Sequence, residues 1–229
     1  MASGISTPPV ATLHYIYDPL CGWCYAAAPL AQAASQTPGL LLSLHGGGML
    51  SDHNRRQMSA AWRDYVLPHD KRIAALSGQI FGEAYFQGLL EDGSVILDST
   101  PPITAVLCAQ SLQGLGLLML EKIQAAHYQH GMKVAEQQVL IALATELGLD
   151  ATKFAQRFAE LSPAAAAQHI QQSRELLAQV GGNGFPSFVL EQPGQALQVL
   201  NASHHLGQPA SWSAFIAAQI APHFTTTKD

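Results

Sequence analysis

Apolar runs of strand length occur near both ends of the chain, and a long stretch of helical periodicity lies between them. Residues 14–17 are aromatic and β-branched, which favours a strand. The alanine-rich residues 25–36 favour a helix, and residues 40–44 form a second buried run of strand length. The first fifty residues therefore predict a β-α-β unit, in which two parallel strands are joined by a right-handed crossover.

From residue 51 the pattern changes to one helix after another, with no convincing strand before residue 181. Ser51 and Asp52 are expected to cap a helix that ends near Pro68, because proline removes a backbone donor from a helix. A second helix is expected from residue 69 to residue 90. Further helix starts are indicated at residues 98–102, 150 and 162–163.

The strand pattern returns after the glycine-rich residues 181–184. Two short apolar runs on either side of a Gln-Pro-Gly-Gln turn predict a β-hairpin, and residues 210–220 predict a closing amphipathic helix. The expected fold class is therefore α/β, with a β-α-β half and a β-β-α half. Residues 1–50 and 181–229 are expected to form one domain, and residues 51–180 a helical insertion domain between its halves.

Charge is scarce and unevenly distributed along the 229 residues. Charged residues make up 12%, hydrophobic residues 48%, and the net charge is −5. This composition excludes a disordered chain, a coiled coil and a protein that binds nucleic acid or acidic lipid through a basic surface. No apolar run approaches the roughly 18 residues of a membrane-spanning helix.

The insertion carries most of the charge. Between residues 52 and 178 lie 10 of the 11 Lys and Arg residues and 13 of the 16 Asp and Glu residues. The two end segments are therefore expected to form an almost uncharged core, whose surface beside Cys21, Trp23 and Phe185 would receive unfolded peptide or a second subunit. The first ten residues, without Lys, Arg or an apolar segment, do not resemble a secretory signal, so a cytoplasmic location is expected.

Two of the three cysteines, Cys21 and Cys24, lie directly between a predicted strand and a predicted helix. At this spacing both sulfur atoms lie on one helix face, and the first lies at the helix N-terminus, where free N–H groups and the helix dipole favour a thiolate. An exposed thiolate is the nucleophile of thiol–disulfide exchange. Cys24, one turn further, would then resolve the mixed disulfide.

Two other interpretations of the cysteine pair are possible. Half a zinc site would need two more ligands, for which the ten histidines leave room. A purely structural disulfide is disfavoured, because a bond between residues three apart restrains almost no chain. Redox chemistry is the interpretation that the strand–turn–helix context favours.

The Cys-Gly-Trp-Cys segment, the strands around it and the Gly-Phe-Pro that leads the hairpin resemble a thioredoxin fold. The long helical block makes the chain similar to the DsbA family of thiol–disulfide oxidoreductases, and residues 18–25 (DPLCGWCY) most resemble its FrnE-like, protein-disulfide-isomerase branch. The resemblance implies that Cys21 attacks, that Cys24 resolves, and that Pro186 is a cis-proline beside them. It also implies that the backbone of Phe185 pairs with an extended substrate peptide.

Some residues near the motif have two possible roles. Asp18 would either tune the thiolate chemistry and relay a proton, or cap the turn before the cysteines. Trp23 would either contact a peptide or only pack. Gly22-Trp23 replaces the Pro-His of the strongly oxidising periplasmic members, so their redox potential does not carry over. Cys108, among apolar residues of a predicted helix, is expected to be a buried thiol.

The expected function is therefore a protein-disulfide oxidoreductase or isomerase acting on protein or peptide cysteines, in the reductase or isomerase direction. Its electron partner would be glutathione or a thioredoxin-type reductant, with no cofactor and no metal. A chaperone-like peptide-binding module with a redox switch is one alternative. A kappa-type glutathione-dependent isomerase or transferase is another, disfavoured because that branch carries serine where Cys21 stands.

Overall fold

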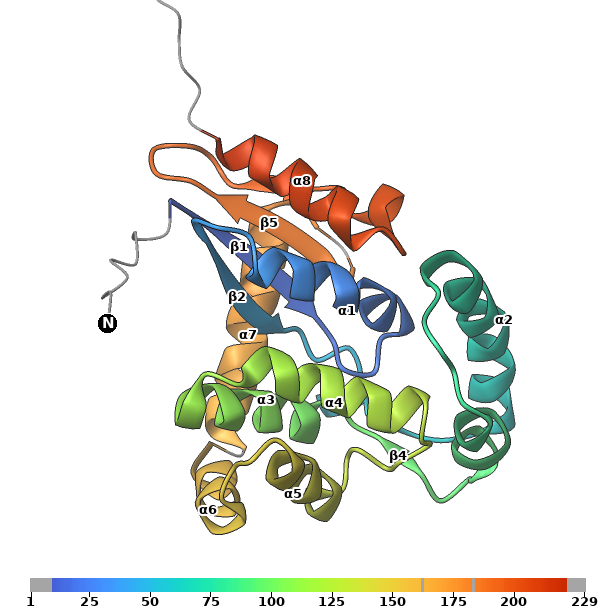
Figure 1. Ribbon diagram of the computed structural model, residues 1–229. Helices are drawn as coiled ribbons and strands as arrows, with labels where there is room; N and C mark the ends of the chain where they lie inside the picture. The colour runs from blue at the N-terminus through green and yellow to red at the C-terminus, as the bar shows by residue number, and fades with distance from the viewer. Residues whose placement is uncertain (1–9, 162, 183, 222–229) are drawn as a thin grey trace, which may run out of the picture.

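The computed structural model describes residues 10–161, 163–182 and 184–221. Its centre is a four-stranded sheet in the order β2-β1-β5-β6, in which β1 and β2 are parallel and the other neighbours antiparallel. The strands are β1 (Ala11–Tyr17), β2 (Leu40–Gly46), β5 (Ser187–Glu191) and β6 (Gln198–Leu200). The two ends of the chain thus meet in one sheet, where β5 pairs with β1 (Figure 1).

Helices cover both faces of this sheet. Helix α1 (Gly22–Ser35) and helix α8 (Pro209–Ile220) pack on one face, and helix α7 (Ala164–Gln179) packs on the other (Figure 1). Successive side chains of a strand point to opposite faces. Tyr15 accordingly belongs to the core on the α1 side, whereas Ile16 packs on the α7 side. Strand β1 therefore packs against the helices on both faces of the sheet.

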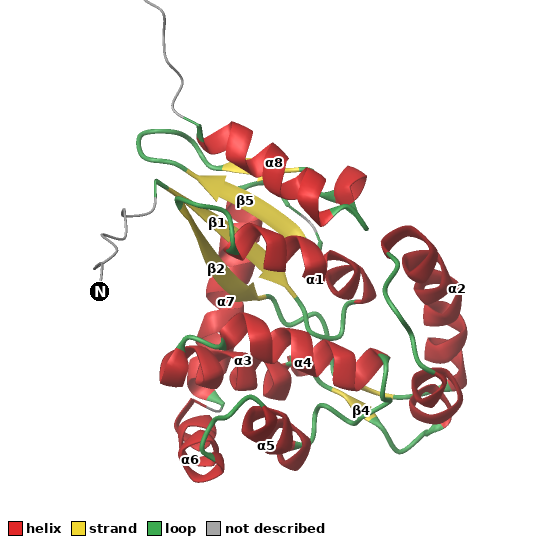
Figure 2. Cartoon of the chain, viewed as in Figure 1, coloured by secondary structure: helices red, strands yellow, loops and turns green. Residues whose placement is uncertain are grey.

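The other helices lie between β2 and β5 in the sequence, and Figure 2 shows them beside the sheet rather than on its faces. They are α2 (Ala60–Ser77), α3 (Thr100–Gln113), α4 (Gly116–Tyr128), α5 (Gln137–Glu146) and α6 (Ala151–Leu161). The predicted succession of a β-α-β unit, a helical block and a β-β-α unit is confirmed. Among the described residues, no helix is both long enough and apolar enough to span a membrane.

The helical block contains one short ladder that the sequence did not predict. Strand β3 (Arg56–Gln57) pairs with strand β4 (Ile96–Leu97) in antiparallel orientation. Each strand has only two residues, which is too short to show the alternation that marks a strand. The expectation of a block without strands is therefore wrong at these two segments.

Two of the predicted helices are also wrong, because Pro68 does not end a helix. Helix α2 is continuous from Ala60 to Ser77 and begins after Ser59, whose hydroxyl accepts a hydrogen bond from the Trp62 amide at 3.2 Å. Pro68 lies on the exposed side, where a carbonyl that loses its helical partner can bind water. Residues 84–91 form only single π- and 3₁₀-helical turns, so the helix expected through residue 90 ends at Ser77.

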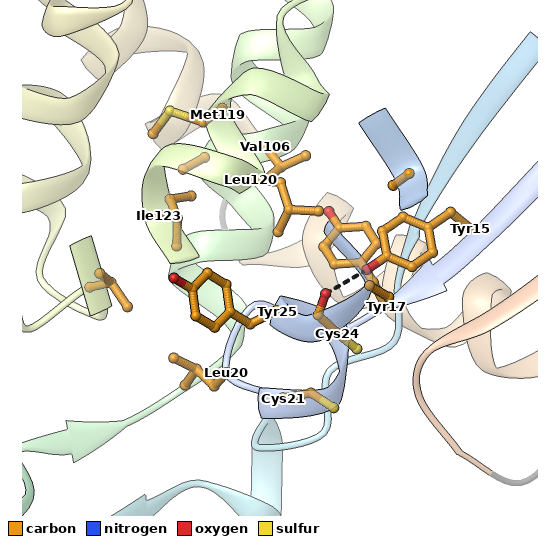
Figure 3. Packing of buried hydrophobic residues seen from close by; sticks show 14 of the residues in the cluster. Tyr15, Tyr17, Leu20, Cys21, Cys24, Tyr25, Val106, Met119, Leu120 and Ile123 are labelled. Atoms are coloured by element: carbon orange, nitrogen blue, oxygen red, sulfur yellow. Dashed lines mark hydrogen bonds between the residues drawn. The ribbon is translucent and has the colours of Figure 1, made fainter. Parts of the chain in front are cut away.

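One hydrophobic core joins the sheet to the helical block. Val106 of α3 and Leu120 of α4 belong to the same buried cluster as Tyr15 of β1 and Cys24 of α1 (Figure 3). The hydroxyl of Tyr15 donates a hydrogen bond to the backbone carbonyl of Cys24 at 3.1 Å. The first turn of α1 is thus held from the sheet side and from the block side at once.

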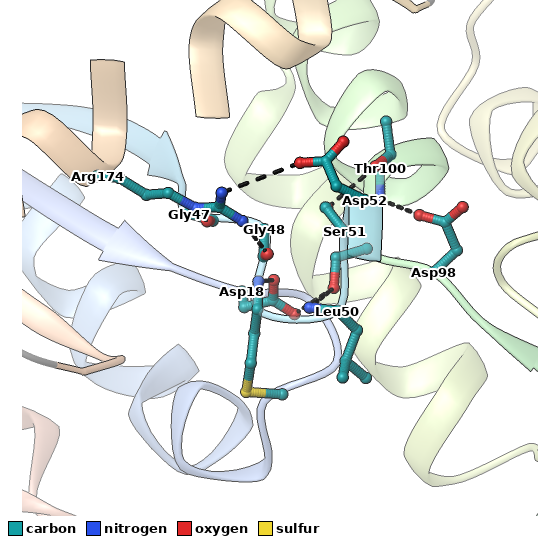
Figure 4. Close-up of polar contacts among 11 residues, drawn as sticks. Asp18, Gly47, Gly48, Leu50, Ser51, Asp52, Asp98, Thr100 and Arg174 are labelled. Atoms are coloured by element: carbon teal, nitrogen blue, oxygen red, sulfur yellow. Dashed lines mark hydrogen bonds and ion pairs between the residues drawn. The ribbon is translucent and has the colours of Figure 1, made fainter. Parts of the chain in front are cut away.

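A buried carboxylate joins three segments immediately before α1. Asp18, which is fully buried, accepts hydrogen bonds at Oδ1 from the Leu20 amide (2.9 Å) and the Ser99 hydroxyl (2.9 Å). Its Oδ2 accepts from the Met49 amide at 2.5 Å. Ser99 in turn accepts from the Leu50 amide at 3.1 Å. The loop before α1, the loop after β2 and the start of α3 therefore converge on one side chain (Figure 4).

The loop after β2 is held from its other side by α7. Arg174 donates hydrogen bonds to the carbonyls of Gly47 (2.8 Å) and Gly48 (2.6 Å), as Figure 4 shows. A side chain at Gly47 would not fit, because its Cβ would lie 2.1 Å from the ring of Phe185. The loop after β2 thus lies between Arg174, Asp18 and the segment that leads into β5.

Helix α2 packs directly against the first residue of α1. A Cβ on Gly22 would lie 2.8 Å from Cδ1 of Ile73 and 3.0 Å from Oδ1 of Asp70. Asp70 is buried, accepts a hydrogen bond from the Tyr85 hydroxyl at 2.9 Å, and has a pKa that burial raises to about 6. Glycine at position 22 is therefore what allows α2 to approach α1 this closely.

We expect Asp18→Asn to reduce the pH dependence of stability. Burial raises the pKa of Asp18 from 3.8 to about 6 despite its three hydrogen bonds, so the folded state binds the proton more tightly than the unfolded state. The resulting stabilisation is fully present below pH 4 and is lost as the pH rises through 6. The variant should lack this pH-dependent decrease in the free energy of unfolding, which is on the order of 2–3 kcal/mol. Urea unfolding between pH 4 and pH 7.5 measures it.

Ser99→Ala is the matched control for this experiment. It removes one hydrogen-bond donor from Asp18 and should lower the free energy of unfolding by about 1 kcal/mol, while the carboxyl group still titrates. An Asp18→Asn profile that falls as steeply with pH as that of the wild type would contradict the prediction.

We also expect Gly22→Ala to lower the free energy of unfolding by about 1–2 kcal/mol, because Ile73 and Asp70 are buried and have little room to move. Gly93→Ala is the control, since nothing lies within 4 Å of a Cβ at that position. Its effect should stay within about 0.5 kcal/mol. Equal free energies of unfolding for the two variants would contradict the prediction, because they would show that α2 moves to accommodate the extra methyl group.

Candidate active site

Cys21 and Cys24 lie at the beginning of α1, and both are free thiols. Cys21 is the N-cap residue, with an extended backbone (φ −92°, ψ 113°), and its carbonyl accepts from the amides of Cys24 (2.9 Å) and Tyr25 (3.0 Å). The first amides of a helix lack intrahelical partners and carry the positive end of its dipole. A negative charge that develops at Cys21 is thus placed where the helix stabilises it.

Cys21 is much less exposed than the cysteine motif predicts. Only 6% of the residue is accessible, and Cys24 is completely buried. The segment before β5 covers Cys21, whose Sγ donates to the Phe185 carbonyl across 3.6 Å. The peptide bond between Phe185 and Pro186 is cis, the isomer that the family resemblance implies. Of the two cysteines, Cys21 is the more accessible.

Cys24 is held as a thiol by its surroundings. Burial raises its pKa well above the usual value, and the neighbouring Cys21 adds to the effect. The amide of Asp18 donates to Cys24 Sγ at 3.4 Å, which partly opposes the shift, whereas the negative charge of the Asp18 carboxylate increases it. Asp18 therefore caps the turn, and its charge also raises the pKa of Cys24. That it relays a proton stays a prediction.

An apolar pocket of about 390 Å³ opens beside the dithiol. Trp23, Phe185 and Pro186 line it together with residues from α1, β6 and the turn before α8, and none of its lining residues is charged. Trp23 and Phe185 are half-buried. None of the residues that line the pocket belongs to the helical block. That this surface receives an unfolded peptide or a second subunit stays a prediction.

Two charged side chains of α2 reach the site although sequence reasoning did not identify them. Asp70 lies against Gly22, as described above, and the guanidinium carbon of Arg72 lies 5.8 Å from the ring centre of Trp23. The sequence holds no signal for either contact. The predicted helix ended at Pro68, whereas α2 continues past Asp70 and Arg72. Both contacts depend on the packing of α2 against α1.

The third cysteine lies outside the Cys-Gly-Trp-Cys motif, on another helix. Cys108 of α3 is completely buried, as predicted, and burial raises its pKa to about 12. Within the described ranges, no group of three or more His, Cys, Asp and Glu side chains is arranged to hold a metal ion.

No protein-family model and no curated protein sequence matches the chain. Among solved structures, the cytosolic disulfide reductase DsbM from Pseudomonas aeruginosa is 50% identical, with a TM-score of 0.86 over 91% of this chain and 98% of that one. A structure of DsbM with GSH is 48% identical, with a TM-score of 0.84 over the same shares of both chains.

A candidate protein disulfide isomerase from Nitrosomonas europaea shares the fold at 24% identity, with a TM-score of 0.75 over 93% of this chain and 99% of that one. The identity to DsbM extends over nearly the whole of both chains, and its level is far above what a shared fold alone requires. The resemblance derived from the cysteine motif is confirmed: the chain belongs to the DsbA-like family of thiol–disulfide oxidoreductases.

Proposed function

We propose that the protein is a cytoplasmic disulfide reductase that passes two electrons from the Cys21–Cys24 dithiol to disulfides of proteins or peptides, and that glutathione returns the pair to the reduced state. The observation that carries the proposal is the dithiol itself, at the start of α1 beside a cis-proline, in a chain that is 50% identical to a cytosolic disulfide reductase. The structure of that protein with GSH supports glutathione as the thiol.

The reaction proceeds in two exchanges. The Cys21 thiolate attacks one sulfur of the substrate disulfide, so that a bond from Cys21 Sγ forms, the substrate S–S bond breaks, and the other substrate sulfur leaves as a thiolate. Cys24 then loses its proton and attacks Cys21 Sγ, which releases the second substrate thiol and leaves a Cys21–Cys24 disulfide. Two glutathione thiols reverse these steps on the enzyme and leave as glutathione disulfide.

The environments of the two sulfur atoms support this division of roles. Cys21 lies at the helix N-terminus and is the more accessible of the two. The raised pKa of Cys24 keeps it protonated at neutral pH, so it attacks only when the mixed disulfide at Cys21 brings an electrophilic sulfur within reach. The resolving step is therefore expected to accelerate as the pH rises above neutral.

The Phe185 carbonyl supports an extended mode of peptide binding. In the reduced protein it accepts from the Cys21 thiol. Once Cys21 is a thiolate, that donor is lost, and the carbonyl can accept a backbone N–H from a substrate strand. The apolar pocket beside Trp23 and Phe185 would then receive a neighbouring side chain of the peptide.

We expect Cys21→Ser to abolish the reduction of insulin disulfides, with a loss of at least about 10³-fold, because a serine hydroxyl cannot attack a disulfide at neutral pH. Cys24→Ser should also lose turnover, but it should accumulate a mixed disulfide at Cys21. Turbidity of the released insulin chain measures the first result, and intact-protein mass spectrometry measures the second.

Cys108→Ala is the matched control, because it removes the third thiol, which is buried in α3 and has Arg157 and Glu160 as its charged neighbours. It should keep at least half of the wild-type rate. Wild-type protein that reduces insulin no faster than Cys21→Ser would refute the proposal, and it would leave a peptide-binding module whose cysteines act at most as a switch.

A further inference from the structure

An arginine without an acidic partner lies beside the ring of the tryptophan between the two cysteines. Arg72 of α2 is exposed, and its guanidinium carbon lies 5.8 Å from the ring centre of Trp23. Within the described ranges, four of the six arginines form ion pairs with Asp or Glu side chains and Arg72 does not. Asp70, two residues earlier, is buried and bonded to Tyr85 instead. The charge of Arg72 is therefore available to a ligand.

The position of this charge relative to the pocket is informative. Trp23 lines the apolar pocket, and its ring is also in contact with the guanidinium of Arg72. The pocket and this positive charge therefore share one indole ring. No lining residue of the pocket is charged. A ligand held by its sulfur at Cys21 therefore meets apolar surface in the pocket and a cation beyond Trp23. A small thiol with a carboxylate near its cysteine fits both.

We propose that Arg72 determines the specificity for glutathione by binding one of its carboxylates while its sulfur is at Cys21. This inference rests on the proposed reductase function and deepens it. Glutathione is a tripeptide with a carboxylate on the residue at either side of its cysteine, and its net charge at neutral pH is negative. A guanidinium binds a carboxylate through two parallel hydrogen bonds. The cation–π contact with Trp23, 5.8 Å from guanidinium carbon to ring centre, keeps the Arg72 side chain beside this ring.

The fold does not require this arginine. Arg72 is exposed on α2, and a cation–π contact at an exposed site contributes little to stability. The helix is held instead by the side chains that it buries, Ile73 and Asp70 among them. Replacement of Arg72 is therefore expected to leave the fold intact and to act on the reaction.

The test measures how fast Cys21 forms a mixed disulfide in the full-length Cys24→Ser protein. Two disulfides are compared, namely oxidised glutathione, which carries carboxylates, and bis(2-hydroxyethyl) disulfide, which is uncharged. Arg72→Gln should lower the second-order rate constant for oxidised glutathione about 10-fold and change that for the uncharged disulfide less than about 2-fold. Arg72→Lys, which keeps the charge but not the planar fork, should fall between the two.

Two control variants separate recognition from general charge. Lys71→Gln removes the same charge from the adjacent position of α2, and Arg56→Gln removes another guanidinium stacked on a tryptophan, 4.3 Å from the ring centre of Trp62. Both should change each rate constant less than about 2-fold. Raising the NaCl concentration should slow the reaction of the parent with oxidised glutathione and leave the Arg72→Gln variant almost unaffected, because salt screens exposed charges.

The outcomes separate a failure of Arg72 recognition from a failure of the reductase function. Equal losses on both disulfides would overturn the inference, because Arg72 would then act through Trp23 or the dithiol and not on a carboxylate. No loss, or the same loss in Lys71→Gln, would also overturn it, while the reductase function would stand. If the parent forms no mixed disulfide with either compound, the proposed function itself fails, and the inference fails with it.

Discussion

The buried carboxylate of Asp18 is the interaction on which the geometry of the active site depends. Burial without partners would be costly for a carboxylate, and here three donors from three different segments satisfy it. The backbone amide of Asp18 donates to Cys24 Sγ, so the residue that organises the loops also contacts Cys24. The raised pKa of Asp18 shows that this arrangement reduces the cost of burial but does not cancel it.

The active site is assembled from parts of the chain that are distant in sequence. The start of α1 supplies the dithiol, and the segment before β5 supplies the cis-proline and the carbonyl that covers Cys21. The loop after β2 leaves space for the Phe185 ring because residue 47 is glycine. Helix α2 closes the remaining side against Gly22. Each part restrains another, so the position of Cys21 reflects the packing of the whole molecule.

Contact with α2 restricts the size of residue 22, the first of the two residues between the cysteines. The side chains of Ile73 and Asp70 occupy the space that any larger residue at position 22 would need. The position of α2 and the identity of residue 22 are thus coupled by sterics. Because the same helix brings Arg72 to Trp23, the closeness that requires glycine also places a cation beside the dithiol.

Local features of the sequence were sufficient to predict much of the fold and the centre of the site. The strand, the cysteine motif and the helix that follows are adjacent in the chain, and so are Pro186 and the hairpin it leads. The periodicity of such short segments reports which side chains face a core. For the same reason Cys108 was correctly predicted to be buried.

Other features depend on contacts between distant segments, and local periodicity cannot report those. Pro68 looks like a helix end, yet α2 continues because Pro68 faces solvent while Ile73 packs on α1. Cys21 is covered by a residue 164 positions away. The sequence by itself determined that a dithiol begins a helix in a thioredoxin-like fold. Only the tertiary structure decided how far Cys21 is exposed and which charged groups surround it, because both follow from side-chain packing between α1, α2 and the segment before β5.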